Sequence, residues 1–173
     1  WVAEHPQAHL PVTFDNWFTQ PAFCRFLDQE LKLAYVGTLA STDKVNLKTG
    51  QISLGDFAER LKQEHLAAVS HNRTPIFQRI HIPFKGEHET YSSYCNTHRL
   101  HNFGRQRLVI NYRQADLSDK PTFYMSNRLI WHAPGITRIR RHRWPVEVYH
   151  EEGKAEGLDQ YQLRDFRGIQ RHV

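Results

Sequence analysis

The sequence is poor in cysteine and in long apolar runs. Cys24 and Cys95 are the two thiols of a 173-residue chain, too few for the disulfide framework that small secreted domains use. The longest apolar stretches, such as Leu66–Val69, fall far short of the roughly 20 residues that a membrane-spanning helix needs. We therefore expect a protein of a reducing cytoplasm, with no membrane association.

Several common catalytic signatures are also missing. The chain has no glycine-rich phosphate loop, no Gly-x-Ser-x-Gly elbow and no His-Glu-x-x-His pattern, which disfavours kinases, α/β-hydrolases and zincin proteases. Basic residues are in surplus instead, because 23 Lys and Arg against 18 Asp and Glu give a net charge of +5. This surplus favours an anionic partner such as nucleic acid.

Apolar periodicity predicts a strand, helix, strand unit at the start of the chain. Residues 10–14 form a short β-branched run that stops at Asp15, so an acid stands where a strand ends. Residues 21–33 carry apolar side chains at helical spacing, and residues 33–39 form an apolar run typical of a buried strand.

The remaining pattern predicts a helix, a β-rich block and further helices. Residues 53–66 have the periodicity of a helix, with Ser53 and Asp56 as candidate caps. Residues 77–127 show almost no helical periodicity and contain four strand-like runs. Helical character returns after Gly135, over residues 136–154 and again over residues 160–173.

Two carboxylates on different predicted elements suggest a metal site. Asp15 follows the first strand, and Glu147 follows the basic cluster Arg138–Arg143 on a late helix. Such a pair can bind two divalent cations about 4 Å apart for phosphoryl transfer, and its hard oxygen ligands suit Mg²⁺. On a helix, Glu147 and Lys154 also share one face.

Each of these features also has a purely structural interpretation. The basic cluster also fits a solvated helix face, Asp15 a turn or cap residue, and Glu147 a member of a salt-bridge ladder. A third reading is a structural zinc site formed by Cys95, His98 and His101, with His88 as the nearest fourth ligand.

The late helix resembles a family signature. In DDE-type insertion-sequence transposases whose ribonuclease-H-like core holds a β-rich insertion, the signature is Tyr, two residues, Arg, three residues, Glu, six residues, Lys. Arg143, Glu147 and Lys154 match this spacing, and Arg140 stands at the Tyr position. The segment Val12–Phe18 is similar to the strand and turn around the family's second catalytic Asp.

The resemblance implies an α/β fold, with a ribonuclease-H-like mixed sheet flanked by helices and incomplete at its N-terminal side. Residues 1–173 would be the C-terminal part of one catalytic domain. Within it, residues 77–127 would be the inserted β-rich subdomain, and residues 136–173 the helices that carry the catalytic Glu.

The resemblance also implies the chemistry. Asp15 and Glu147 would be the second and third catalytic acids and would ligate Mg²⁺, for which Mn²⁺ substitutes. Arg143 and Lys154 would hold transposon-end phosphates, with Arg140 in the Tyr role. The partners would be transposon-end and target DNA, bound by a homodimer in the nucleoid region of a bacterial cytoplasm.

One acid of the family's set is absent. The family's first catalytic Asp lies on an earlier strand, but no Asp precedes Asp15 in this sequence. We therefore expect a fragment of a transposase that is inactive by itself. The alternative is a non-catalytic DNA-binding remnant of a mobile element.

Overall fold

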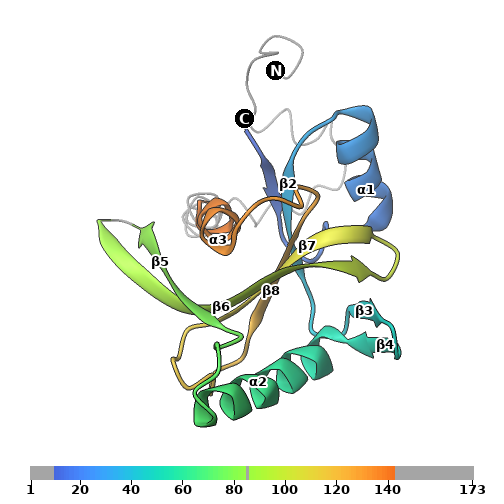
Figure 1. The fold of residues 1–173 in the computed structure, drawn as a ribbon. Coiled ribbons are helices and arrows are strands. Elements are labelled where there is room, and N and C mark those ends of the chain that lie inside the picture. Colours follow the sequence, from blue (N-terminus) through green and yellow to red (C-terminus); the bar gives the residue numbers. More distant parts are fainter. Residues whose placement is uncertain (1–9, 85, 143–173) are drawn as a thin grey trace, which may run out of the picture. The chain divides into compact units, whose positions relative to one another are not determined.

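The computed structural model describes residues 10–84 and 86–142, which form a mixed α/β protein around one sheet (Figure 1). The described strands are β1 (Val12–Phe14), β2 (Tyr35–Leu39), β3 (Lys44–Leu47), β4 (Gly50–Ser53), β5 (Gln78–Phe84), β6 (Glu87–Leu100), β7 (Gly104–Tyr112) and β8 (Thr122–Ser126). Their order is β1-β2-β8-β7-β6-β3-β4, and β5 also pairs with β6. The predicted α/β class with flanking helices is thus confirmed.

The sheet is mixed because its edge strand runs parallel to its neighbour. β1 pairs in parallel with β2, and the other pairings are antiparallel. Two strands share one edge of the 14-residue strand β6. Its first half pairs with β5, and its last residues pair with β3.

The first helical segment is shorter and less regular than the predicted helix over residues 21–33. Helix α1 (Pro21–Arg25) passes into the π-helical turn η1 (Phe26–Glu30). The wider turn is closed by the Leu31 N–H, which donates to the Phe26 carbonyl oxygen. Lys32 then takes a positive φ of 55°, which ends the helix before β2.

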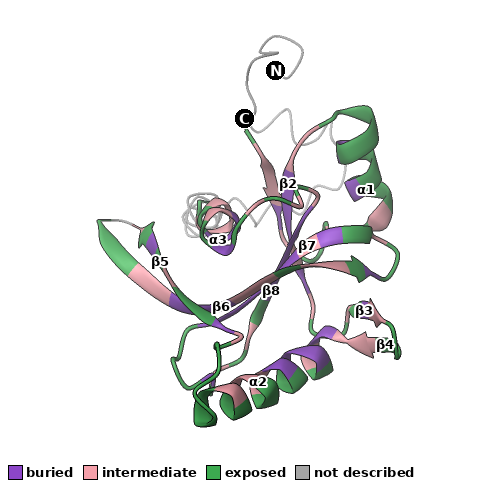
Figure 2. Cartoon of the chain, viewed as in Figure 1, coloured by how far each residue is buried: buried purple, intermediate pink, exposed green. Residues whose placement is uncertain are grey.

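Helix α2 (Leu54–Ser70) confirms the predicted helix and extends it by four residues. The Ser53 hydroxyl accepts a hydrogen bond from the Asp56 N–H at 3.0 Å, as the predicted cap requires. Its buried face is Leu54, Phe57, Ala58 and Leu61. Figure 2 shows this face turned to the sheet and the opposite face exposed.

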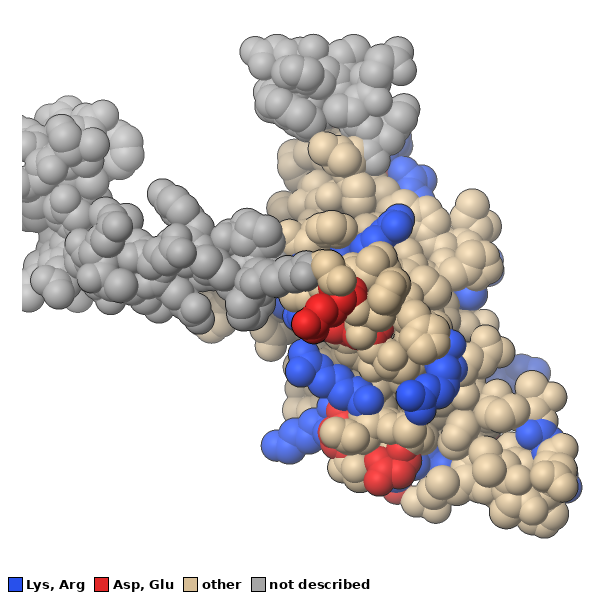
Figure 3. Space-filling view, turned by 90° about the vertical axis from the view of Figure 1, so that its left-hand side faces the viewer, with Lys and Arg blue, Asp and Glu red and all other residues tan. Residues whose placement is uncertain are grey.

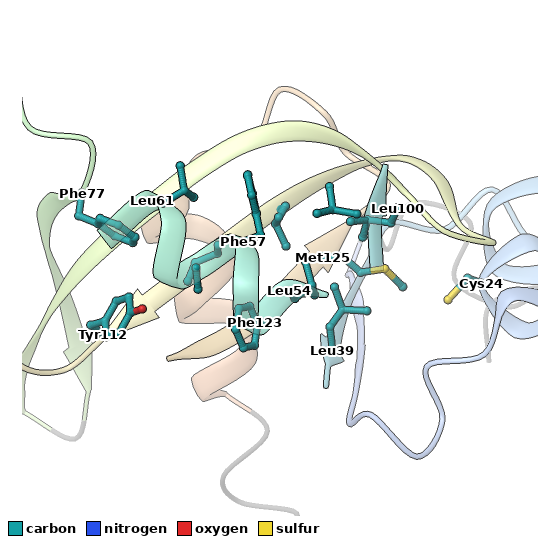
Figure 4. Close-up of a cluster of buried hydrophobic side chains, with 14 of the residues drawn as sticks. Cys24, Leu39, Leu54, Phe57, Leu61, Phe77, Leu100, Tyr112, Phe123 and Met125 are labelled. Carbon is teal, nitrogen blue, oxygen red and sulfur yellow. The ribbon is translucent and has the colours of Figure 1, made fainter. Parts of the chain in front are cut away.

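The two longer helices cover opposite faces of the sheet (Figure 1). Under α2, the main core joins its apolar face to side chains from the strands, including Leu39, Phe123 and Met125 (Figure 4). Under α3 (Ala133–Arg141), a smaller core contains Val36, Val109, Tyr124, Ala133 and Ile136. The alternation of side chains along each strand supplies both cores.

The β-rich block expected over residues 77–127 is confirmed as β5 to β8. Its strands share the sheet with the first part of the chain, because β8 pairs with β2 on one side and β7 on the other. The short hairpin of β3 and β4 was not predicted, since its four-residue strands carry little periodic signal. Within the described residues, no helix has the length and apolar character to cross a membrane.

Candidate functional site

Asp15 lies in a tight turn directly after the edge strand β1. Its side-chain Oδ1 accepts a hydrogen bond from the Trp17 N–H at 3.2 Å, and its carbonyl oxygen accepts one from the Phe18 N–H at 3.2 Å. Trp17 and Phe18 are 79% and 58% exposed. The acid therefore stands at a strand end beside two solvent-facing aromatic rings.

Strand β1, which directly precedes Asp15, lies close to β2 because β2 has a glycine opposite Phe14. Phe14 and Gly37 are register partners, and a Cβ atom built on Gly37 would lie only 2.7 Å from the Phe14 ring. The ring also meets Phe23 edge to face, with centroids 5.2 Å apart. Close packing of Phe14 thus fixes the backbone immediately before Asp15.

A threonine hydroxyl joins the ends of the two parallel strands. Thr19 Oγ1 lies 2.8 Å from the Asp15 carbonyl oxygen and 2.7 Å from the Thr38 carbonyl oxygen. The turn after β1 is therefore tied to the end of β2.

Arg140 of α3 reaches the same strand ends from the other side. Its Nε donates to Thr38 Oγ1 at 2.8 Å, and that hydroxyl lies 3.5 Å from the Phe14 carbonyl oxygen. Helix α3 packs across β2, β5 and β8 and reaches β1. A single hydroxyl thus separates the Arg140 guanidinium from the backbone of the residue before Asp15.

Arg141, the next residue of the basic cluster, contacts the protein itself. Its guanidinium forms an ion pair with Glu89 of β6, and its Cζ lies 4.1 Å from the centroid of the Phe84 ring. Tyr91 also donates to Glu89, at 2.7 Å. These contacts fasten the last turn of α3 to the β5 and β6 hairpin.

The charge of Glu89 depends on this network. Burial acts to raise the pKa of its carboxyl, but hydrogen bonds from Tyr91 and Arg141, with the Arg141 charge, outweigh burial and hold the pKa below its ordinary value. On the side of the molecule shown in Figure 3, basic and acidic side chains lie close together. The Arg141 guanidinium therefore makes contacts within the protein, with Glu89 and Phe84, a role that the sequence did not indicate.

The structure places two of the five predicted site residues. Asp15 and Arg140 are brought to neighbouring strand ends by the contacts above. Arg143, Glu147 and Lys154 lie outside the described residues. Sequence reasoning did not identify Thr19 and Thr38, whose bridging role carries no sequence signal because it depends on the pairing of β1 with β2.

The zinc reading is not supported by the strand geometry. Cys95 faces α3, where Arg107 Nε lies 3.1 Å from its sulfur. His98 faces α2, with its ring 5.0 Å from that of Phe57 and its Nε2 2.7 Å from the Tyr94 hydroxyl. Burial, with a smaller effect of Arg107, lowers the pKa of His98. Two ligands on opposite faces of one strand cannot bind the same ion.

Residues 10–84 and 86–142 contain no group of three or more His, Cys, Asp or Glu side chains arranged to hold a metal ion. Asp15 would therefore need carboxylates from beyond this part of the chain to form a site. Searches for relatives give no guide to those partners, because no family model and no curated protein matches the sequence.

Proposed function

We propose that this chain is part of the catalytic domain of a DDE-type DNA transposase with a ribonuclease-H-like core. The main support is the link from Arg140 through Thr38 to the strand that ends at Asp15. Arg140 stands at the signature's Tyr position, seven residues before Glu147. The resemblance implies that a residue close in sequence to the third acid lies near the second acid, and the contact of Arg140 with Thr38 supports that arrangement.

The resemblance assigns a role to each charged residue. Asp15 and Glu147 would ligate Mg²⁺, which supplies charge stabilisation for in-line displacement at phosphorus. Arg143 and Lys154 would neutralise phosphates of the transposon end, and Arg140 would orient a phosphate from its place beside Thr38. Since phosphoryl transfer depends on positioning and electrostatics, fixed cations would contribute to catalysis alongside the acids.

The β-rich strands would be the family's insertion. In this chain they continue the sheet that carries Asp15, since β8 lies next to β2. The DNA contacts of such an insertion would therefore be positioned relative to Asp15 by a continuous hydrogen-bonded ladder.

The proposal is tested first by metal binding in the 173-residue chain. Mn²⁺ bound by Asp15 would broaden the NMR signal of the Trp17 N–H, which donates to the Asp15 carboxylate. We expect this broadening to disappear in Asp15→Asn and to weaken at least tenfold in apparent affinity in Glu147→Gln, since one of two shared carboxylates is lost. The control variant Asp56→Asn changes an acid that caps α2.

The Glu147→Gln variant tests whether Asp15 and Glu147 bind the same cation. Unchanged Mn²⁺ affinity at Asp15 would show that the two acids do not share a cation, and the transposase assignment of the site would fail. A second test uses a longer protein that supplies a further Asp, in which Glu147→Gln must abolish Mg²⁺-dependent strand cleavage. DNA binding that ignores both metals, with no cleavage, fits the non-catalytic remnant instead.

A further inference from the structure

An unusual stretch without acids covers the two longest neighbouring strands. After Glu89 the next acid in the sequence is Asp116, and the intervening residues include four arginines and no lysine. Strand β7 and most of β6 fall within this stretch. The hairpin of β3 and β4 extends the same end of the sheet and has no acid either.

The register places three of these arginines on one face. Arg99 of β6 is directly opposite Arg105 of β7, and Thr97 is opposite Arg107. Since side chains two residues apart point to the same side of a strand, Arg105 and Arg107 share that face. It is the face that carries α3 farther along the sheet, because Arg107 Nε donates to the Trp131 carbonyl oxygen at 2.9 Å.

Amide side chains continue the row across the next two strands. Asn46 of β3 is the register partner of Arg99, and Gln51 of β4 is the partner of Asn46. The Gln51 and Asn46 amides are hydrogen-bonded to each other at 2.8 Å. We name the set Arg99, Arg105, Arg107, Asn46 and Gln51 the arginine face.

The pairing of Arg99 with Arg105 costs stability in the free protein. Like charges directly opposite each other on neighbouring strands are destabilising, and both side chains are exposed. Neither forms an ion pair with any described carboxylate. Arg141, by contrast, is neutralised by Glu89 at the other end of β6. An external anion would remove the repulsion that the carboxylates of residues 10–84 and 86–142 leave uncompensated.

We propose that the arginine face binds a nucleic-acid backbone, with Arg99 and Arg105 on phosphates and the Asn46 and Gln51 amides beside them. Guanidinium groups suit phosphate because they donate paired hydrogen bonds in a plane. A row across strands 4.7–4.9 Å apart offers successive donors along a polyanion. The choice of DNA rests on the proposed function, whereas the backbone chemistry follows from the face alone.

The experiment measures DNA binding by the 173-residue chain in EDTA. Fluorescence anisotropy with a 25-base-pair labelled duplex gives the affinity over a series of salt concentrations, for wild type and for Arg99→Gln/Arg105→Gln. Loss of two phosphate contacts at a slope of about 0.9 each lowers the salt dependence by about 1.8, so the affinity that the variant loses relative to wild type should be about 60-fold larger at 0.1 M salt than at 1 M salt. The same duplex as single strands shows which form is preferred.

The control changes the net charge equally on another surface. Arg60→Gln/Arg73→Gln removes two exposed arginines from α2 and the turn after it, on the opposite face of the sheet. We expect this variant to keep the wild-type salt slope. Equal losses in both variants would reduce the effect to net charge and overturn the proposal. So would binding of an acidic polyglutamate peptide, rather than DNA, through Arg99 and Arg105.

Thermal unfolding provides an independent readout. Because the two arginines repel each other, Arg99→Gln/Arg105→Gln should melt at a higher temperature than wild type in 10 mM salt, and the difference should vanish at 0.5 M as screening grows. A lower melting temperature would mean that the arginines are structural. Since EDTA removes metals, failure here leaves the Mn²⁺ test of Asp15 and Glu147 unaffected, and the reverse also holds.

Discussion

The contact that fixes α3 on the sheet can be tested through one buried hydrogen bond. Asn111 of β7 donates from Nδ2 to Thr137 Oγ1 at 2.9 Å, and both residues are at most 1% exposed. The substitution Thr137→Val keeps the shape of the side chain but removes the acceptor. It leaves the Asn111 amide buried without that partner, which costs about 1–3 kcal/mol in the free energy of unfolding.

A double-mutant cycle extends the test to Asn111, the partner of Thr137. Asn111 Oδ1 is itself buried and makes no hydrogen bond among the described residues. The double variant Asn111→Leu/Thr137→Val therefore removes every side-chain polar atom of the pair, and replacing both partners with apolar groups of similar shape is nearly neutral or stabilising. We expect the double variant to be more stable than Thr137→Val alone.

Urea unfolding followed by circular dichroism measures the effect. With a slope of about 2 kcal/mol/M, Thr137→Val should lower the midpoint by about 0.5–1.5 M, and the double variant should recover most of that loss. A neutral Thr137→Val, or a double variant less stable than either single one, would refute the reasoning. The cycle matters for function because α3 also carries Arg140.

Two further predictions concern the surroundings of the site. In Gly37→Ala, the new methyl group would press on the Phe14 ring, so we expect the free energy of unfolding to fall by about 1–3 kcal/mol. In the double variant, the smaller side chain of Phe14→Leu should relieve part of this loss. Losses in urea unfolding that simply add in the double variant would contradict this account. Glu89, with its lowered pKa, stabilises the fold above its unfolded pKa near 4.5 and loses this contribution as the pH falls through the folded value. Below pH 4.5, the free energy of unfolding should therefore fall less steeply with decreasing pH in Glu89→Gln than in wild type. In Tyr91→Phe, which removes one hydrogen bond to the carboxylate, the fall should begin at a higher pH. An identical pH profile for Glu89→Gln and wild type would refute the assigned network.

Local signals in the sequence determined several elements correctly. Ser53 and Asp56 marked the start of α2 because capping depends on residues three positions apart. The β-branched and aromatic runs marked β5 to β8, and the β-branched run before Asp15 marked β1. The end of α1 was harder, since the change to η1 at Phe26 has no periodic signal.

The sequence by itself determined which residues carry charge and where several of the strands and helices lie, such as α2 and β5 to β8, because those properties depend on neighbours along the chain. Only the tertiary structure decided which charges act together. Strand register placed Arg99 directly opposite Arg105 and put Cys95 and His98 on opposite faces of β6. The packing of α3 brought Arg141 to Glu89 and Arg140 to Thr38. These outcomes depend on pairings between distant segments, which a one-residue change of register would reverse.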